Sequence, residues 1–239
     1  MENNPVYIAL DFSKPQEVLD FLDRFETNGL AVKIGMELFY HTGPALLADL
    51  KGAGCQIFLD LKLHDIPNTV KKAMKGLAGF GVDIVNVHSA GGKTMMEAAL
   101  EGLDQGTSLG RKRPKCIAVT QLTSTSQQMM NQYLLIGGKI EDVALSYARM
   151  AQSAGLDGVV CSPLEVPSIK KTCGKDFLTV TPGIRPAGNL ADDQVRITTP
   201  KKARQLGSDA IVVGRSITQA EDPLQAYQQI QAEWSEANE

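Results

Sequence analysis

Charged residues gather in one short segment of the sequence, FLDLKLHDIPNT at residues 58–69. Within it, Asp60 and Lys62 are two residues apart, and Asp65 follows three residues later. In an extended strand, side chains two residues apart share a face, so Asp60 and Lys62 are expected to point to one side and the leucines beside them to the other. Burying an aspartate and a lysine costs several kcal/mol per ion unless they pair. A purely structural reason for the pair is therefore weak.

Asp65 has two interpretations that the local sequence does not separate. It stands just before Ile66 and Pro67, so it is a candidate N-cap for a helix that has Pro67 in its first turn. It also extends the charged cluster, and one side chain can serve both roles.

Two more charged residues lie at the ends of earlier apolar runs. Asp11 ends the first run, and Lys33 lies near the end of the second. A lone charge at a strand end is usually solvated, but charges from three consecutive units should converge at one rim. Where signs alternate, carboxylates keep lysines protonated and lysines keep aspartates ionised. Lys62, between Asp60 and Asp65, then becomes a positioned cationic acid, which suits proton delivery to a developing carbanion better than imine formation.

Eight short runs rich in Val, Ile and Leu alternate with stretches whose apolar residues recur at helical spacing. The runs are residues 6–11, 30–35, 56–62, 83–88, 115–121, 157–162, 177–182 and 209–214. Alternating strands and helices with right-handed crossovers give a parallel sheet, and eight such units close into a barrel. The sequence therefore predicts the α/β class and a (β/α)8 TIM barrel, with residues 1–239 forming a single domain. A doubly wound open sheet is less favoured, because no strand is followed by G-x-G-x-x-G.

The ends of the last two strands predict a phosphate site. Gly214 and Arg215 follow the eighth strand directly, where barrels commonly bind phosphate through backbone N–H groups, and Arg215 adds a bidentate partner. Arg185 follows the seventh strand and offers a second basic group. The long polar segment 183–199 suits a mobile lid, from which Gln194 could reach the phosphate. A disordered surface insertion is the alternative interpretation of this segment.

Composition and charge argue against several classes of function. The net charge of −3 gives no basic field of the kind that attracts nucleic acid or acidic lipid. The N-terminus has no basic region followed by an apolar one, and no apolar run approaches a membrane span, so a cytoplasmic protein is expected. Four cysteines without CxxC spacing and three scattered histidines suggest neither a metal site nor a redox pair. Cys116 and Cys161 are expected to be small buried hydrophobic residues.

Over its whole length the chain resembles the bacterial type of the orotidine 5′-phosphate decarboxylase family. The resemblance rests on ALDFS at 9–13, VKIG at 32–35, FLDLKLHDIPNT at 58–69, NVH at 86–88, TPGIRP at 181–186 and VVGRSI at 212–217. The D-x-K-x-x-D element of Asp60, Lys62 and Asp65 is specific for that superfamily, and Lys33 ahead of it narrows the resemblance further.

The resemblance implies decarboxylation of orotidine 5′-phosphate (OMP) to UMP and CO2 in pyrimidine synthesis, with no metal or organic cofactor. Lys62 would protonate C6 of the pyrimidine, and Asp60 would sit against the substrate carboxylate within a network that also contains Lys33 and Asp65. Asp65 would serve the site of the partner subunit, so a homodimer is implied. Substrate contacts would come from Asp11 and Lys33 at the ribose, Ile66 and Thr69 in the partner's site, Thr123 and Ser124 at the pyrimidine edge, and Arg185, Gln194, Gly214 and Arg215 at the phosphate, with Pro182 also expected to contact substrate.

Two other functions stay open. Magnesium-dependent relatives that act on sugar phosphates, such as hexulose-phosphate synthase or keto-gulonate-phosphate decarboxylase, share D-x-K-x-x-D but place a metal-binding glutamate where Lys33 stands. A cation at position 33 would repel magnesium, which disfavours this alternative. A catalytically silent barrel that binds nucleotides as a sensor or scaffold is the second, and the intact set of alternating charges argues against it.

Overall fold

The computed structural model of the chain describes residues 4–186 and 197–236, and its strands form one closed barrel. All neighbouring strands are parallel, and β1 pairs with β2 on one side and with β8 on the other. The strands are β1 (Val6–Ala9), β2 (Ala31–Gly35), β3 (Gln56–Leu63), β4 (Ile84–His88), β5 (Lys115–Val119), β6 (Gly158–Val160), β7 (Leu178–Thr181) and β8 (Ala210–Val213). The predicted (β/α)8 barrel is confirmed, and pairing between the first and last strands rules out the open sheet.

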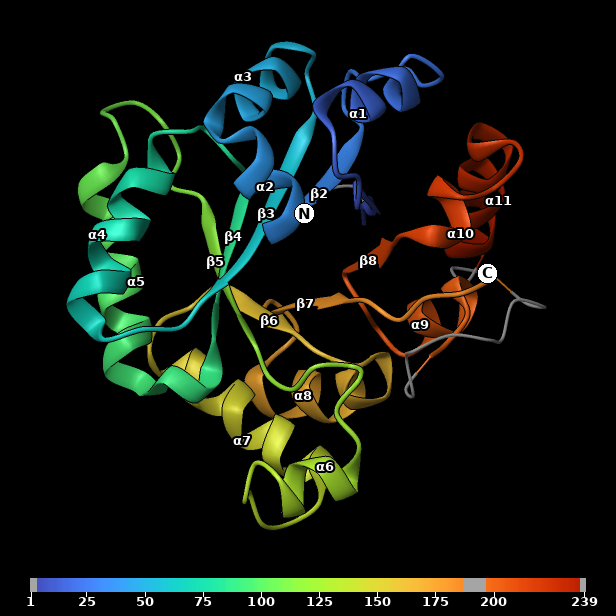
Figure 1. The fold of residues 1–239 in the computed structure, drawn as a ribbon. Helices are drawn as coiled ribbons and strands as arrows, with labels where there is room; N and C mark the ends of the chain where they lie inside the picture. The colour runs from blue at the N-terminus through green and yellow to red at the C-terminus, as the bar shows by residue number, and fades with distance from the viewer. Residues whose placement is uncertain (1–3, 187–196, 237–239) are drawn as a thin grey trace.

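Helices surround the barrel on all sides (Figure 1). They are α1 (Pro15–Leu22), α2 (Met36–Thr42), α3 (Pro44–Gly52), α4 (Pro67–Ala78), α5 (Gly92–Gly106), α6 (Gln127–Gln132), α7 (Ile140–Ser153), α8 (Val166–Cys173), α9 (Pro200–Gln205), α10 (Arg215–Thr218) and α11 (Pro223–Ser235), with 3-10 turns η1 (Ser89–Gly91) and η2 (Pro163–Glu165). Proline occupies the first turn of several of them, where its missing N–H is not needed. Among the described residues, no helix is both long enough and apolar enough to cross a membrane.

The apolar core has two layers because side chains alternate along each strand. The inner layer fills the barrel and contains Tyr7, Phe58 and Ile117, with the Tyr7 and Phe58 rings packed edge to face at 5.9 Å. The outer layer lies between strands and helices, and it includes Leu59 and Leu61. The strand alternation predicted for β3 therefore places its leucines toward the helices, as expected. The side chain between them is left to face the barrel interior.

The four cysteines are buried, and none of them forms a disulfide bond. Cys116 and Cys161 belong to the outer core layer, which confirms their prediction as small hydrophobic residues. Burial, followed by the nearby Asp157 carboxylate, raises the pKa of the Cys116 thiol to about 12. This thiol therefore stays protonated and unreactive at neutral pH.

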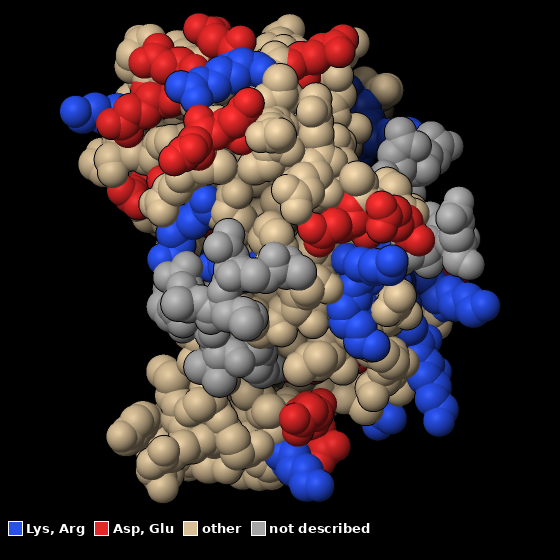
Figure 2. All heavy atoms as spheres, turned by 90° about the vertical axis from the view of Figure 1, so that its right-hand side faces the viewer, with Lys and Arg blue, Asp and Glu red and all other residues tan. Residues whose placement is uncertain are grey.

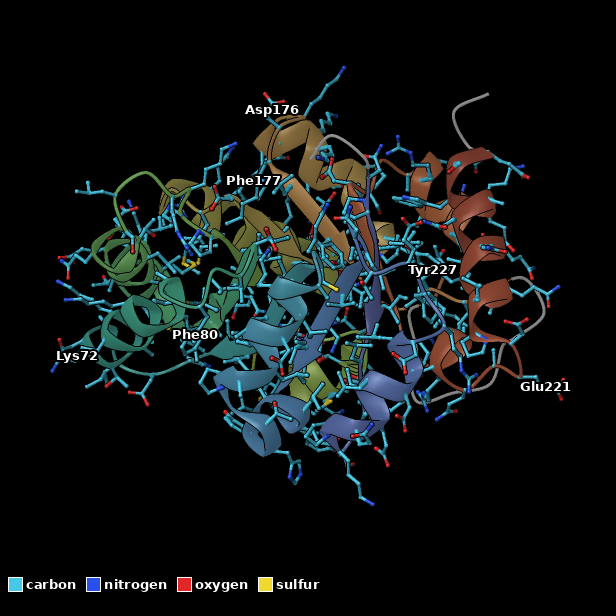
Figure 3. All side chains as sticks on the ribbon, turned by 90° about the horizontal axis from the view of Figure 1, so that it is seen from above. Lys72, Phe80, Asp176, Phe177, Glu221 and Tyr227 are labelled. Carbon is cyan, nitrogen blue, oxygen red and sulfur yellow. The ribbon has the colours of Figure 1, made fainter. Side chains whose placement is uncertain are left out.

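Charge on the outer surface is mixed. Figure 2 shows the face that carries the C-terminal helices, where acidic and basic side chains lie in neighbouring patches. Lys72 on α4 and Glu221 after α10 point outward from opposite sides of the barrel (Figure 3). Among the described residues of this face, the basic side chains form no continuous surface of the kind that tracks a nucleic-acid backbone (Figure 2).

Three aspartates tie neighbouring strands together at the N-terminal end of the barrel. The three residues stand immediately before β4, β6 and β8. Each carboxylate accepts a backbone N–H from the preceding strand, β3, β5 or β7, at 2.7 Å, and each also pairs with a cation. The sets are Asp83 with Ile57 and Lys51, Asp157 with Cys116 and Arg113, and Asp209 with Thr179 and Lys170. Charge-assisted hydrogen bonds of this kind are stronger than neutral ones, so these aspartates stabilise strand pairing.

Asp209→Ala is expected to lower the free energy of unfolding by about 2–4 kcal/mol. The substitution leaves the ammonium of Lys170 and the N–H of Thr179 without their carboxylate, which lies 2.6 and 2.7 Å from them. Urea unfolding monitored by circular dichroism measures the change. Asp176→Ala serves as the control, because Asp176 is exposed and points into solvent (Figure 3). If Asp209→Ala lowers the free energy of unfolding no more than Asp176→Ala does, Asp209 does not stabilise the pairing of its strands.

Candidate active site

A cavity of about 510 Å³ opens at the C-terminal ends of the strands, the end where barrels of this type hold their sites. Most of the site residues predicted from the sequence line this cavity: Asp11, Lys33, Asp60, Lys62, Thr123, Ser124, Pro182, Arg185, Gly214 and Arg215. They come from the ends of β1, β2, β3, β5, β7 and β8. The structure thus brings Asp11, Lys33, Asp60 and Lys62 together with the predicted phosphate end in one cavity, whereas Asp65, which was expected to converge with them, lies outside it.

Strand β3 departs from regular geometry at the centre of the cluster. Its register against β4 shifts between Leu59 and Leu63, and Lys62 has a φ of 52°. A non-glycine residue in this left-handed region costs about 1–2 kcal/mol. The prediction that Asp60 and Lys62 share a side is confirmed, because both line the cavity. The assumption of an extended backbone at Lys62 is wrong, since the strand bulges there.

Asp60 lies between two lysines. The ammonium of Lys62 donates to its Oδ1 at 2.7 Å, and Lys33 Nζ lies 3.6 Å from its Oδ2. Lys33 also donates to Asp11 at 3.1 Å, and this second carboxylate is far more exposed, at 55% of its side chain against 11% for Asp60. The alternating order predicted for Asp11, Lys33, Asp60 and Lys62 is therefore present as a chain of contacts.

The pKa of Asp60 is set by opposing effects. Burial by itself would raise the pKa of this carboxyl, but Lys33 and Lys62 nearby, with hydrogen bonds from Lys62 and Asn86, hold it below its ordinary value. Asp60 is therefore a carboxylate at neutral pH. It carries a fixed negative charge at the cavity wall.

Glycine at position 35 leaves room for Lys33. A Cβ added at Gly35 would stand 3.2 Å from Lys33 Nζ and 3.7 Å from Asp11 Oδ1. A side chain at this end of β2 would crowd the ammonium that bridges Asp11 and Asp60. The small residue helps to keep that lysine in place.

Asp65, Ile66 and Thr69 lie outside the cavity of their own chain and are exposed. Helix α4 begins at Pro67 with Ile66 as its N-cap, so the prediction that Asp65 caps this helix is wrong. The residue before a proline prefers an extended backbone, and Ile66 adopts one, with φ −58° and ψ 149°. The carboxylate of Asp65 instead accepts the N–H of Ile66 at 2.7 Å. Within the described residues Asp65 makes no ion pair.

The predicted phosphate end is built around Arg185, Gly214 and Arg215. Arg185 is 9% exposed, and its guanidinium donates to the carbonyl of Ile184 at 3.1 Å. Both ends of the 183–199 segment are fixed, since Arg185 N–H donates to Thr198 at 2.9 Å. Residues 187–196, and with them Gln194, lie outside the described residues. The lid predicted for this segment stays a prediction.

Sequence reasoning missed residues in the cavity wall and beside it. Gln121 is 5% exposed and lines the cavity wall together with Val119, which precedes it by two residues. Alternation along β5 from the inward-facing Ile117 places it inside, so a polar residue at an inward position was the available signal. Asn86 on β4, which contacts Asp60, was quoted only as part of a motif.

Two histidines stack beside the cluster. The rings of His64 and His88 lie 5.5 Å apart and 17° from parallel. Burial first, then the neighbouring His64 and Lys62, lowers the pKa of His88. His88 is therefore neutral at neutral pH, which leaves its Nδ1 able to accept the N–H of Ala90.

These features define a class of protein. The chain is a (β/α)8 barrel whose C-terminal rim joins an Asp–Lys charge cluster to arginines in one cavity. Such a cavity is suited to a small anionic ligand.

Comparison with known proteins gives the family. Residues 4–230 match the model of the Orotidine 5'-phosphate decarboxylase / HUMPS family, so the chain belongs to that family. It is 61% identical over 234 residues to the Orotidine 5'-phosphate decarboxylase of Bacillus licheniformis, covering 98% of both chains. The protein of that name from a Geobacillus species is 60% identical over 232 residues, with 97% of both covered.

Solved structures agree with this assignment. The crystal structure of Orotidine 5'-phosphate decarboxylase from Lactobacillus acidophilus is 44% identical, with a TM-score of 0.87 over 97% of this chain and 99% of that one. An uncharacterized conserved protein from Geobacillus kaustophilus is 55% identical, with a TM-score of 0.86 over 97% of this chain and 100% of that one. The predicted family and fold are both confirmed.

Asp60→Asn is expected to lower the free energy of unfolding by about 2–4 kcal/mol at pH 7, because it leaves two lysines without their shared anion. The pKa of Asp60 is lowered in the folded state, so this contribution is complete above the ordinary Asp value of about 3.9 and fades as pH falls through the lowered value. Urea unfolding of wild type and variant from pH 7 down to pH 3 measures it.

The matched control is Asp11→Asn, which makes the same change on the exposed neighbour of Lys33. Its cost is expected to stay within about 1 kcal/mol. Equal stability of wild type and Asp60→Asn at pH 7 would show that the buried carboxylate is not held by its cations.

Proposed function

We propose that this chain is an orotidine 5′-phosphate decarboxylase, a carboxy-lyase that converts OMP to UMP and CO2 in UMP synthesis without a metal or organic cofactor. The observation that carries the proposal is the buried Asp60 carboxylate between Lys33 and Lys62. Relatives about 60% identical to this chain are named orotidine 5′-phosphate decarboxylase. Residues 1–239 would act as one catalytic domain.

Lys62 is the proton donor in this proposal. The bond between C6 and the carboxylate carbon breaks, the electron pair stays on C6, and CO2 leaves. The ammonium of Lys62 then gives a proton to C6, and the neutral amine regains a proton from solvent. Without an electron sink in a cofactor, a preorganised cation next to the developing carbanion supplies the stabilisation. Hydrogen bonding to Asp60 at 2.7 Å fixes the direction of that ammonium.

Asp60 faces the departing carboxylate in this scheme. Repulsion between two carboxylates offers a ground-state contribution, but stabilisation of the carbanion by Lys62 is the stronger account, because it acts on charge that develops in the transition state. Asp60 contributes by keeping Lys33 and Lys62 in place. Asp11 and Lys33 bind the ribose hydroxyls at the same rim.

The remaining cavity residues bind the rest of the nucleotide. Thr123 and Ser124 meet the pyrimidine edge, and Pro182 contacts the substrate beside them. Arg185, Gly214 and Arg215 hold the phosphate, with Gln194 reaching it from the lid. Binding energy from the phosphate, remote from the reacting carbon, helps to organise the site.

Position 33 separates this proposal from the magnesium-dependent alternative. The family model covers more than one activity by its description, but Lys33 places an ammonium 3.6 Å from Asp60. A cation there repels a divalent metal and competes for the same carboxylate. OMP is therefore favoured over a sugar phosphate that needs magnesium.

We also propose a homodimer with shared sites. Asp65, Ile66 and Thr69 are exposed and away from their own cavity, so they are available to a second copy. Ile66 is 67% exposed, and Met36, which follows the neighbouring strand, is 44% exposed. Large apolar side chains at the rim favour burial against another chain. Asp65 would complete the charge network of the partner's site.

Lys62→Ala is expected to reduce the turnover number for OMP by at least about 10²–10⁴-fold while UMP still binds, because it removes the proton donor but not the phosphate site. Loss of OMP absorbance, with enzyme treated with EDTA, measures turnover, and calorimetry measures UMP binding. Lys72→Ala, which alters an outward-pointing lysine on α4, should leave turnover unchanged (Figure 3). Wild-type protein that binds UMP but never turns over OMP would favour the silent binder, and turnover only with magnesium would favour the sugar-phosphate relatives.

Mixing Lys62→Ala with Asp65→Ala protein tests the shared site. Each variant alone should be nearly inactive. After subunit exchange half of the dimers are hybrids, and each hybrid has one intact site, so activity should recover to at most about one quarter of wild type. No recovery despite exchange, demonstrated by mass spectrometry of the hybrids, would place Asp65 in the site of its own chain, and wild-type activity of Asp65→Ala alone would place it outside the site.

A further inference from the structure

Asn86 connects the two central residues of the site. It lies at the middle of β4, is 1% exposed, and points into the barrel from the strand next to β3. Its Nδ2 donates to Asp60 Oδ1 at 2.7 Å. Its Oδ1 accepts the backbone N–H of Lys62, also at 2.7 Å. One amide therefore contacts the buried carboxylate and the backbone that carries the neighbouring lysine.

The hydrogen bond to Lys62 acts at the point where β3 leaves its regular path. The ladder between β3 and β4 shifts register between Leu59 and Leu63, so Lys62 lies in a stretch of β3 that falls outside the regular pairing with β4. The side chain of Asn86 accepts the backbone N–H of Lys62 at this point. Residues held in the left-handed region persist only where their surroundings determine them, and the φ of 52° at Lys62 needs such support.

The hydrogen bond to Asp60 acts on the same oxygen that receives the ammonium of Lys62. With two donors on Oδ1, the carboxylate has little freedom to rotate, and the ammonium is held in one direction. An amide suits both tasks because it offers a donor and an acceptor at once. An apolar residue offers neither, and a carboxylate offers only acceptors.

We propose that Asn86 is a positioning residue for the decarboxylation, which holds the backbone of Lys62 and the carboxylate of Asp60 so that the Lys62 ammonium meets C6. The inference rests on the proposed function and adds to it a residue that does not touch the substrate. Displacement of a catalytic group by about 1 Å can cost about 10²-fold in rate. The effect of Asn86 should therefore fall on kcat rather than on nucleotide binding.

Asn86→Leu removes both hydrogen bonds and keeps a side chain that branches at the same position. We expect kcat for OMP to fall by about 10²-fold, and the dissociation constant of UMP to change by less than about threefold. Thr179→Val is the matched control, because it also replaces a buried hydrogen-bonding side chain by an apolar isostere, at the opposite end of the barrel. It should lower stability and leave kcat within about twofold. A folded Asn86→Leu protein with kcat within about threefold of wild type would overturn the proposal, as would an equal loss in Thr179→Val.

Asn86→Asp separates the two hydrogen bonds and serves where the leucine variant does not fold. As a carboxylate it accepts the N–H of Lys62 but repels Asp60, whereas as a carboxylic acid it can donate to Asp60 as the amide does. Proximity to Asp60 raises the pKa of the new acid, while Lys62 and Lys33 oppose this, and burial lowers the pKa of His88 on the same strand. We expect kcat of Asn86→Asp to rise relative to wild type as pH falls from 8 to 5. A ratio that stays flat would overturn the donor role.

A direct readout separates failure of this inference from failure of the proposed function. Carbon NMR titration of Asp60 needs no turnover, and the pKa of Asp60 should be higher in Asn86→Leu than in wild type, because a hydrogen bond that lowers it is lost. Wild-type protein without OMP turnover would overturn the proposed function and the catalytic role of Asn86 together. Normal turnover with an unchanged Asp60 pKa in the variant would overturn the Asn86 inference alone.

Discussion

One buried anion determines how the mouth of the barrel is built. The carboxylate of Asp60 is taken out of water, which costs several kcal/mol unless cations and donors replace the lost hydration. Lys33 from β2, Lys62 from β3 and Asn86 from β4 supply these partners. Three adjacent strands must end at matching heights for this to occur, and the closed barrel holds them there. The bulge of β3 lets the side chain of Lys62 turn back toward Asp60 on the same strand.

The two ends of the barrel use ion pairs of the same kind for different purposes. At the N-terminal end, Asp83, Asp157 and Asp209 accept backbone N–H groups of the neighbouring strands, so their charges stabilise the fold. At the C-terminal end, Asp60 and Lys62 bind each other at the wall of an open cavity, where a ligand can compete for them. This separation agrees with the division between stability and catalysis in barrels of this type.

Much of this could be read from the sequence because it depends on local periodicity. Eight apolar runs predicted the eight strands, and alternation within β3 placed Asp60 opposite the leucines. What the sequence could not predict depends on contacts between strands. The left-handed backbone at Lys62 follows from a register shift against β4, and Asn86 gains its role only through that shift. The interpretation of Asp65 as the N-cap is wrong because Pro67 favours an extended backbone at the residue before it, so Ile66 is the N-cap.

The most direct test of the central claim is the pKa of the Asp60 carboxyl in the wild-type protein, measured by carbon-detected NMR with selectively labelled aspartate and assigned through the Asp60→Asn variant. If Asp60 is held as an anion by Lys33, Lys62 and Asn86, its pKa lies below the ordinary value of about 3.9. A pKa at or above that value would mean that burial outweighs the cations. The carboxyl would then lose its charge more readily than an exposed aspartate, and the account of the site as a network built on a fixed buried anion would be wrong.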